Sequence, residues 1–186
     1  YWEYSADTEY MTDDGLYDFY MGPYRELGYL QSPPGTMYNY SNTGFSLAGL
    51  ITEVGSAEYY VPYLTDNLFI PLQMDRTLFR PEDVLADGDF AYGNGYDDQG
   101  NARIEAPDAY DNPWLRPCGY AFSSVLDLSQ FLIFLRNLGG GLLHQDLVSA
   151  MMAEQVNTLE RGYMLSYGYG LQIARGLKLG DTYYDM

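Results

Sequence analysis

The sequence predicts a mainly helical α+β fold with a short C-terminal β-hairpin. Two long stretches, beginning near Thr43 and Leu126, carry apolar residues at the spacing of a helix. Residues that favour helix N-caps precede both stretches, and glycine follows each of them. Apolar residues in β-prone segments bounded by glycine occur at 167–174 and 182–186, where we expect strands that turn around 177–180.

The length of 186 residues fits one domain, or one lobe of a larger domain. A hydrophobic share of 47% is enough for a core. We therefore predict a single partial domain over 1–186, in which 80–117, rich in Gly, Asp, Asn and Pro, forms a long loop. The sequence contains no signal peptide and no apolar run that could span a bilayer, and its start at Tyr1 fits an excised or processed segment.

The charge is strongly acidic, with 26 Asp and Glu residues against 9 Lys and Arg, a net charge of −17. Nucleic acids and anionic membranes require basic residues that neutralise phosphate, so the composition argues against both as partners. Two explanations of the acidic surface stay open. It keeps the protein soluble, or it is an adaptation to high salt, where screening makes a dense acidic surface tolerable.

The sequence contains few residues that could bind a metal or form a disulfide. Cys118 is the single cysteine, so no internal disulfide is possible, and with His144 as the single histidine a zinc site is not expected. The acidic run at 97–101 lacks the spaced ligands and the terminal glutamate of an EF-hand, which favours a turn. We expect no metal and no organic cofactor.

The N-terminal helices lead into one central stretch. Residues 12–14 are expected to cap a short helix that ends at 22–23, and Pro33, Pro34 and Gly35 then force irregular backbone. A helix begins near Thr43, and its expected buried stripe has the spacing i, i+3, i+4 and i+7. The stripe consists of Leu47, Leu50, Ile51 and Val54. Gly55 is expected to end this helix, and a second helix should cover 57–68.

Tyr40 and Asn42 flank Ser41 at the start of the central helix. If this segment is extended, residues two apart share a face, so the phenol of Tyr40 and the amide of Asn42 would address the same small volume. The alternative is purely structural. Ser41, Asn42 and Thr43 are all good N-caps, and Tyr40 could be a core aromatic with a satisfied hydroxyl.

The last long helix begins at about Leu126 and ends at the glycines 139–141, and a short helix follows at 146–153. Its expected buried stripe consists of Leu128, Phe131, Leu132, Leu135 and Leu138.

Four blocks of the sequence together resemble a known family. P-G-T-M-Y-N-Y-S-N-T-G at 34–44 resembles the second motif of the penicillin-recognising serine hydrolases, in the branch of class C β-lactamases, D-Ala-D-Ala peptidases and esterases. The block at 69–77 is similar to "P-L-G-M-x-x-T", with Gln73 where glycine is usual. The block at 116–128 is similar to "P-A-G-G-L-x-S-T-x-x-D-L", and 167–171 to a "Y-G-Y-G" strand. The blocks occur in the family's order.

The resemblance implies the helical lobe of the β-lactamase/transpeptidase-like fold and assigns site residues. It makes Tyr40 the acid/base candidate, while Asn42 would hold a catalytic lysine and donate its amide to the substrate carbonyl. Ser41, Trp114 and Gly119 are candidates for substrate binding. The resemblance also places the loop at 80–117 along the substrate cleft. Its aromatic residues would line that cleft or, alternatively, only pin the loop to the core; they are Tyr92, Tyr96, Tyr110 and Trp114.

Two motifs of the family are missing. The single lysine, Lys178, follows Arg175 by three residues, so no Ser-x-x-Lys is present. His144 is followed by Gln145 and Asp146, so neither Lys-Thr-Gly nor His-x-Gly occurs. Tyrosine, with a pKa of about 10, is a poor base without a neighbouring cation. The chain alone is therefore expected to be inactive.

These observations lead to one functional expectation and one alternative. The resemblance implies a segment of an extracytoplasmic serine hydrolase that acts through an acyl-serine on an amide, a β-lactam or an ester. Its partners would be a small-molecule or peptide substrate and the remainder of the parent hydrolase domain. The alternative is a non-catalytic binding or scaffold domain that keeps the fold. Sequence preceding Tyr1 would discriminate between the two, since Ser-x-x-Lys there favours the enzyme.

Overall fold

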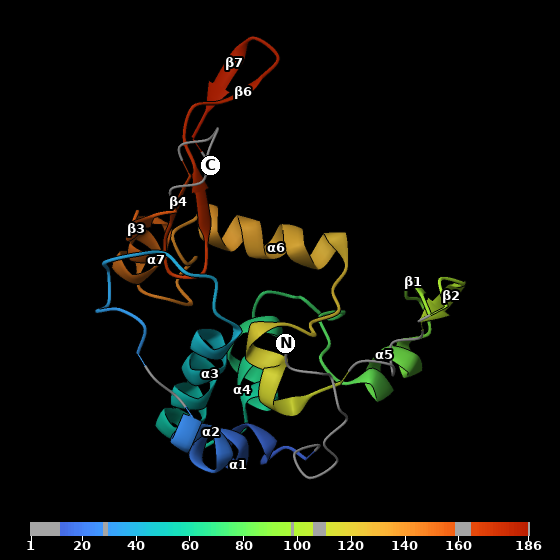
Figure 1. The fold of residues 1–186 in the computed structure, drawn as a ribbon. Coiled ribbons are helices and arrows are strands. Elements are labelled where there is room, and N and C mark those ends of the chain that lie inside the picture. Colours follow the sequence, from blue (N-terminus) through green and yellow to red (C-terminus); the bar gives the residue numbers. More distant parts are fainter. Residues whose placement is uncertain (1–11, 28–29, 98, 106–110, 159–164, 186) are drawn as a thin grey trace. The chain divides into compact units, whose positions relative to one another are not determined.

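The computed structural model describes residues 12–27, 30–97, 99–105, 111–158 and 165–185, and Figure 1 shows its elements. The chain divides into two compact units. The first unit comprises Tyr1–Gly28 and Ser41–Phe131, and the second comprises Tyr29–Tyr40 and Leu132–Met186. The single partial domain expected from the sequence stays a prediction, and each unit is described by itself below.

The first unit contains most of the helical elements. They are α1 (Gly15–Met21), α2 (Pro23–Leu27), α3 (Asn42–Ser56), α4 (Tyr60–Leu64), the π-helical turn η2 (Thr65–Phe69), α5 (Pro81–Asp87) and the 3-10 helix η4 (Pro113–Cys118). Helix α6 (Val125–Arg136) begins in this unit and continues into the second. The expected helix starts near Thr43 and Leu126 are confirmed, as is the predicted predominance of helix.

Helix α3 begins where the sequence predicts, and Ser41 provides its N-cap. Ser41 has extended backbone, and its Oγ accepts a hydrogen bond from the Gly44 N–H at 3.0 Å. The helix runs past Gly55, which we expected to end it, and closes at Ala57 in the left-handed conformation with φ 60°. The second helix therefore begins later than predicted, at Tyr60, and passes into η2.

The predicted buried stripe of α3 is confirmed at Leu50 and wrong at the other three positions, Leu47, Ile51 and Val54, which are all exposed. Ile51 and Val54 are 72% and 66% exposed, and the buried residues are Ser46, Gly49 and Leu50. The reason is a close approach between α3 and η4: a Cβ atom on Gly49 would collide with the ring of Pro117. The helix thus packs through its small residues, which periodicity of apolar residues alone does not reveal.

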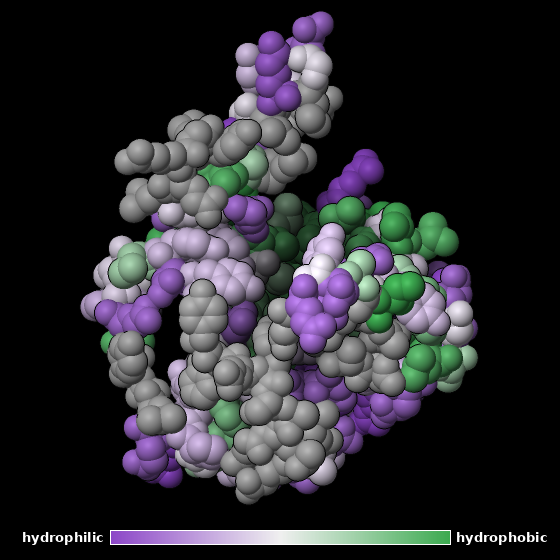
Figure 2. Space-filling view, turned by 45° about the vertical axis from the view of Figure 1, so that its right-hand side comes forward, coloured by the Kyte–Doolittle hydropathy of each residue, from purple (hydrophilic) through white to green (hydrophobic). Residues whose placement is uncertain are grey.

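The residues that helix α6 buries also differ from its predicted stripe. Leu135 is buried as expected, but Leu128, Leu132 and Leu138 are exposed, and the polar Asp127 is buried instead. Figure 2 shows one face of the molecule, on which hydrophobic residues lie at the surface among hydrophilic ones.

Two clusters of buried residues form the core of the first unit. One cluster joins Leu16 and Tyr20 of α1 to Leu50 of α3, and the other consists of Phe69, Met74 and Phe79. Tyr60, at the start of α4, packs against both clusters and contacts the Phe79 ring edge-on at a centroid distance of 5.8 Å.

The segment 80–117, expected to be a structureless loop, contains α5, η4 and a hairpin of β1 (Gly93–Tyr96) and β2 (Ala102–Glu105). Its polar residues form turns. The Asp97 carboxylate accepts hydrogen bonds from the backbone N–H groups of Gln99 and Asn101, at 3.0 and 2.8 Å, and so closes the hairpin. The strands are antiparallel, with Tyr96 opposite Ala102. The prediction that strand is confined mainly to the C-terminus is corrected accordingly.

An ion-pair network fixes the end of this segment. Arg116 of η4, 7% exposed, donates two hydrogen bonds to Asp111, from Nε at 3.1 Å and from Nη2 at 2.7 Å. Its Nη1 also lies 3.5 Å from Asp13, which accepts from Arg80 Nη2 at 2.8 Å. Fork-to-fork pairing of this kind satisfies a buried guanidinium, so the network ties η4 to the chain before α1 and to the start of α5.

The second unit combines α7 (Gln145–Met152) with two antiparallel β-structures. Strands β3 (Val156–Asn157), β4 (Leu165–Tyr167) and β5 (Gln172–Ala174) pair in that order, and β6 (Leu177–Leu179) pairs with β7 (Thr182–Tyr184). A C-terminal hairpin is present as predicted, but its expected pairing and turn are wrong, because 177–179 forms strand β6 and pairs with β7, where the sequence predicted a turn between 167–174 and 182–186. The stretch 167–174 is not one strand, however, because Tyr167 pairs with Gln172 across a turn. Among the described residues, no helix has the length and apolarity needed to cross a membrane.

Candidate active site

Tyr40 lies in the second unit, at the end of an irregular stretch that leads to α3. Its side chain is 74% exposed, so it is not the core aromatic that the structural alternative assumed. Within the described ranges its hydroxyl makes no hydrogen bond. The phenol of Tyr40 is thus an exposed hydroxyl without a hydrogen-bond partner among the described residues.

The segment that carries Tyr40 packs against strand β4. The rings of Tyr38 and Tyr167 lie 5.2 Å apart between centroids, at an interplanar angle of 48°. Burial raises the pKa of Tyr167, and the nearby phenols of Tyr38 and Tyr40 raise it further. The first and fourth sequence blocks, 34–44 and 167–171, therefore meet inside one unit, and Tyr38 anchors the Tyr40 segment to the strand.

A close packing contact explains the glycine that follows Tyr167. A Cβ atom on Gly168 would collide with the carbonyl oxygen of Met151 at the end of α7. The Gly168 N–H also donates to the Leu171 carbonyl at 2.8 Å, which forms the turn into β5. The second position of the Y-G-Y-G block thus serves the packing of β4 on α7.

Asn42 is the first residue of α3 and belongs to the first unit. The cap bond is made by Ser41, so the side chain of Asn42 is not needed to start the helix. That side chain is exposed and has no hydrogen bond in the part of the chain that the structure describes. Because the boundary between the units falls between Tyr40 and Ser41, the two candidate residues are placed separately.

Trp114 has a packing role in the structure. Its ring, in η4, stacks on Phe19 of α1 with centroids 4.1 Å apart and an interplanar angle of 19°. It is partly buried against the cluster that contains Leu16, and its Nε1 is buried without a hydrogen-bond partner among the described residues. This contact corresponds to the alternative in which an aromatic residue pins its segment to the core.

The remaining substrate-binding candidates show no special geometry. Gly119 is exposed, with extended backbone that any residue adopts, and a Cβ atom there would touch nothing within 4 Å. Tyr92 and Tyr96 are exposed, at 57% and 76%. The Oγ of Ser41 is occupied by its cap bond, and Tyr110 lies outside the described residues.

Sequence reasoning did not foresee the role of Asp127. Its buried carboxylate accepts hydrogen bonds from the backbone N–H of Arg76 at 2.8 Å, from Thr77 Oγ1 at 2.9 Å and from Ser124 Oγ at 2.8 Å. These contacts join the second block to the third. The signal was present in the blocks themselves, since Thr77 and Asp127 occupy positions that the family patterns specify.

The described residues offer no metal site, because no three His, Cys, Asp or Glu side chains among them converge. Cys118 donates a hydrogen bond from Sγ to the Leu115 carbonyl at 3.1 Å, and burial raises the pKa of its thiol, which keeps it protonated and unreactive. The single lysine, Lys178 in β6, places its ammonium 5.8 Å from the centroid of the Tyr183 ring.

Comparison with known proteins gives a family match over most of the chain. The sequence model of the Beta-lactamase family matches residues 17–184. Protein flp of Staphylococcus aureus strain MW2 is 32% identical over 108 residues, which cover 58% of this chain and 21% of that protein. The chain thus spans about a fifth of the length of this curated relative.

Solved structures agree with the predicted fold class. The octameric penicillin-binding protein homologue from Pyrococcus abyssi matches with a TM-score of 0.71 and 27% identity, over 88% of this chain and 35% of that one. The D-amino acid amidase from Ochrobactrum anthropi SV3 matches with a TM-score of 0.67 over 94% of this chain and 49% of that one. At 22% identity the second match shows the fold alone.

Proposed function

Because the chain belongs to the Beta-lactamase family, we propose that it forms the tyrosine-bearing part of a serine hydrolase. The reaction would be hydrolysis or transfer at an amide, a β-lactam or an ester through an acyl-serine intermediate. The observation that carries the proposal is Tyr40, whose exposed phenol stands on a segment anchored to β4 by the contact of Tyr38 with Tyr167. The whole protein would act outside the cytoplasm, without a metal or organic cofactor.

In this proposal Tyr40 moves a proton between the serine nucleophile and the leaving group. A phenol performs this work near neutral pH only beside a cation, which stabilises the phenolate. The single lysine of the chain lies in the β6–β7 hairpin, against Tyr183, and does not form a Ser-x-x-Lys motif. The serine and its lysine would therefore come from the remainder of the parent protein.

Asn42 would complete the site at the start of α3. A carboxamide offers both an acceptor oxygen and two N–H donors, so it can hold a lysine ammonium and donate to a substrate carbonyl at once. The cap bond from Ser41 supports this role, because it leaves the amide of Asn42 free of any structural task at the helix terminus.

The test is Tyr40→Phe in the whole protein, which removes the hydroxyl and retains the ring. Loss of a general acid or base should lower the acylation rate by about 10²- to 10⁴-fold, whereas loss of one exposed hydroxyl should leave the melting temperature unchanged. The matched control is Tyr183→Phe, at a tyrosine 67% exposed in the β6–β7 hairpin. Acylation by Tyr40→Phe at the wild-type rate would overturn the proposed role.

The non-catalytic alternative makes a different prediction for the wild-type protein. A binding or scaffold domain that has lost the chemistry would not be labelled by a fluorescent penicillin or a fluorophosphonate. The proposed hydrolase would form a covalent adduct on one serine outside these 186 residues, detectable by peptide mass spectrometry. An adduct on a serine within them would show that the nucleophile has been misplaced.

A further inference from the structure

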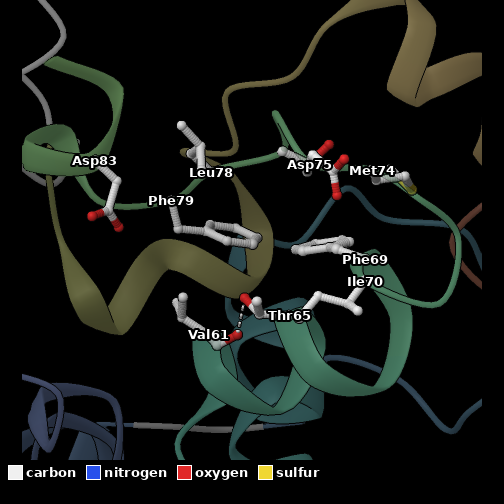
Figure 3. Close-up of a pocket in the computed structure, with 10 residues that line it drawn as sticks. Val61, Thr65, Phe69, Ile70, Met74, Asp75, Leu78, Phe79 and Asp83 are labelled. Carbon is white, nitrogen blue, oxygen red and sulfur yellow. Dashed lines mark hydrogen bonds between the residues drawn. The ribbon is translucent and has the colours of Figure 1, made fainter. Parts of the chain in front are cut away.

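A cavity of about 220 Å³ lies in the first unit, between the end of the α4–η2 helix and the chain that follows it. Phe69 and Phe79 form its aromatic part. Both side chains are buried, and their rings lie 6.1 Å apart between centroids at an interplanar angle of 26°. Figure 3 shows the two rings pointing toward one another, with Val61, Thr65 and Ile70 on the helix beside them.

The π-helical turn shapes this cavity. Two backbone hydrogen bonds span five residues: the Ile70 N–H donates to the Thr65 carbonyl, and the Met74 N–H donates to the Phe69 carbonyl, both at 2.9 Å. The Thr65 hydroxyl donates to the Val61 carbonyl at 2.9 Å. Such wide turns are rare and frequently occur at functional sites. Here the turn leaves Ile70 59% exposed at the pocket while Phe69 is buried.

The rim of the cavity is acidic. Asp75 and Asp83 both line it, and both are exposed. Within the described part of the chain neither carboxylate makes an ion pair, because the two neighbouring arginines pair with other aspartates. Arg76 pairs with Asp87 and Asp89, and Arg80 pairs with Asp13.

From this combination we propose that the cavity binds a small organic cation with an aromatic or alkyl body, such as an arylalkylammonium. The body of the ligand would lie against the phenyl rings of Phe69 and Phe79 and against Ile70. The ammonium would lie at the rim, attracted by the negative charge of Asp75 and Asp83, which form no ion pair with any cation among the described residues. None of these residues belongs to the candidate active site, so this binding function does not depend on the proposed hydrolase activity.

The experiment measures binding of phenethylammonium to the whole protein by calorimetry, beside the neutral isostere 2-phenylethanol. The cation should bind saturably at one site and the alcohol at least several-fold more weakly. Asp75→Asn combined with Asp83→Asn should raise the dissociation constant of the cation by about tenfold, as expected for two partly exposed charge contacts. Added salt should weaken binding of the cation and leave that of the alcohol unchanged.

Two further variants keep the test specific. Asp66→Asn removes one negative charge from the same π-helical turn at an exposed residue that does not line the cavity, so it should change the dissociation constant less than twofold. Ile70→Ala should weaken the binding of both ligands, because it removes part of the apolar wall of the cavity. Equal affinity for cation and alcohol, equal effects of Asp66→Asn and the double variant, or no saturable binding would each overturn the proposal.

Discussion

The hydroxyl of Thr77 donates a hydrogen bond to the carboxylate of Asp127, with 2.9 Å between Oγ1 and Oδ2 across 50 residues of sequence. The same Oγ1 lies 2.9 Å from the hydroxyl of Ser123. Because the proton of Thr77 is directed at the carboxylate, Ser123 is the donor in that second contact. A polar chain therefore links the segment after η2 to the start of α6, and its centre is a buried carboxylate.

This arrangement predicts that Asp127 is important for stability. Asp127→Ala would leave the backbone N–H of Arg76 and the hydroxyls of Thr77 and Ser124 without their acceptor. We expect the free energy of unfolding to fall by about 3 kcal/mol, the range for unpairing donors that bond a buried charged group. Urea denaturation of the whole protein, monitored by tryptophan fluorescence, measures the change.

The matched control for Asp127 is Asp66→Ala, at an exposed aspartate of η2. An exposed substitution of this type should alter the free energy of unfolding by less than about 0.5 kcal/mol. Thr77→Val removes one of the three donors and should cost about 1 kcal/mol. If Asp127→Ala were as mild as Asp66→Ala, the hydrogen bonds at Asp127 would contribute nothing to stability.

Gln73 supports a second prediction, because it occupies a left-handed conformation with φ 59°. This conformation destabilises the folded chain by about 1–2 kcal/mol for a non-glycine residue. A glycine instead gains entropy in the unfolded chain, which lowers the free energy of unfolding by about 0.5–1 kcal/mol. Gln73→Gly should therefore raise the free energy of unfolding by about 0.5 kcal/mol, whereas Gln73→Ala should not raise it. A melting temperature of Gln73→Gly below that of Gln73→Ala would contradict this explanation.

The left-handed backbone also explains why the family patterns have glycine at two positions where this chain has another residue. The P-L-G-M-x-x-T block has glycine where this chain has Gln73, and the P-A-G-G-L block has its second glycine where this chain has Tyr120. Tyr120 has φ 64° and Gln73 has φ 59°. The sequence displayed both departures, but only the structure shows that the backbone at these positions favours glycine.

Local signals in the sequence predicted where the long helices begin but not which faces they bury. Ser41 precedes α3, and its oxygen caps the helix without any help from distant residues. The buried face depends instead on Gly49 meeting Pro117, two residues far apart in the sequence. In 80–117, the turn-forming residues predict a loop, because strands of four residues are too short to show a period.

For the candidate site, the sequence predicted Tyr40 through a motif and the structure added its exposure and its anchor, Tyr38 on Tyr167. The cavity lined by Phe69 and Phe79 could not have been predicted in this way. It depends on a π-helical turn and on residues from α4, η2 and α5 that converge only in the folded chain. No local pattern of residue types encodes that convergence.

The last prediction concerns Tyr60, which packs between the two core clusters of the first unit. Burial raises the pKa of Tyr60 to about 12, and the nearby Cys118 thiol adds to the shift. Below pH ~10 the phenol is protonated in both folded and unfolded chains and has no effect on the pH dependence of stability. Between pH ~10 and ~12 the unfolded chain releases the proton while the folded chain retains it, so stability falls as pH rises.

The total loss from Tyr60 should approach 2–3 kcal/mol, at about 1.4 kcal/mol for each pKa unit. Tyr60→Phe keeps the ring that contacts Phe79 and removes the ionisable group, so its free energy of unfolding should decline less steeply above pH ~10. Urea titrations of both proteins at pH ~9 and at pH ~11.5 provide the comparison. Equal losses in the two proteins would mean that other groups cause the alkaline destabilisation and that Tyr60 ionises as readily in the folded chain as in the unfolded one.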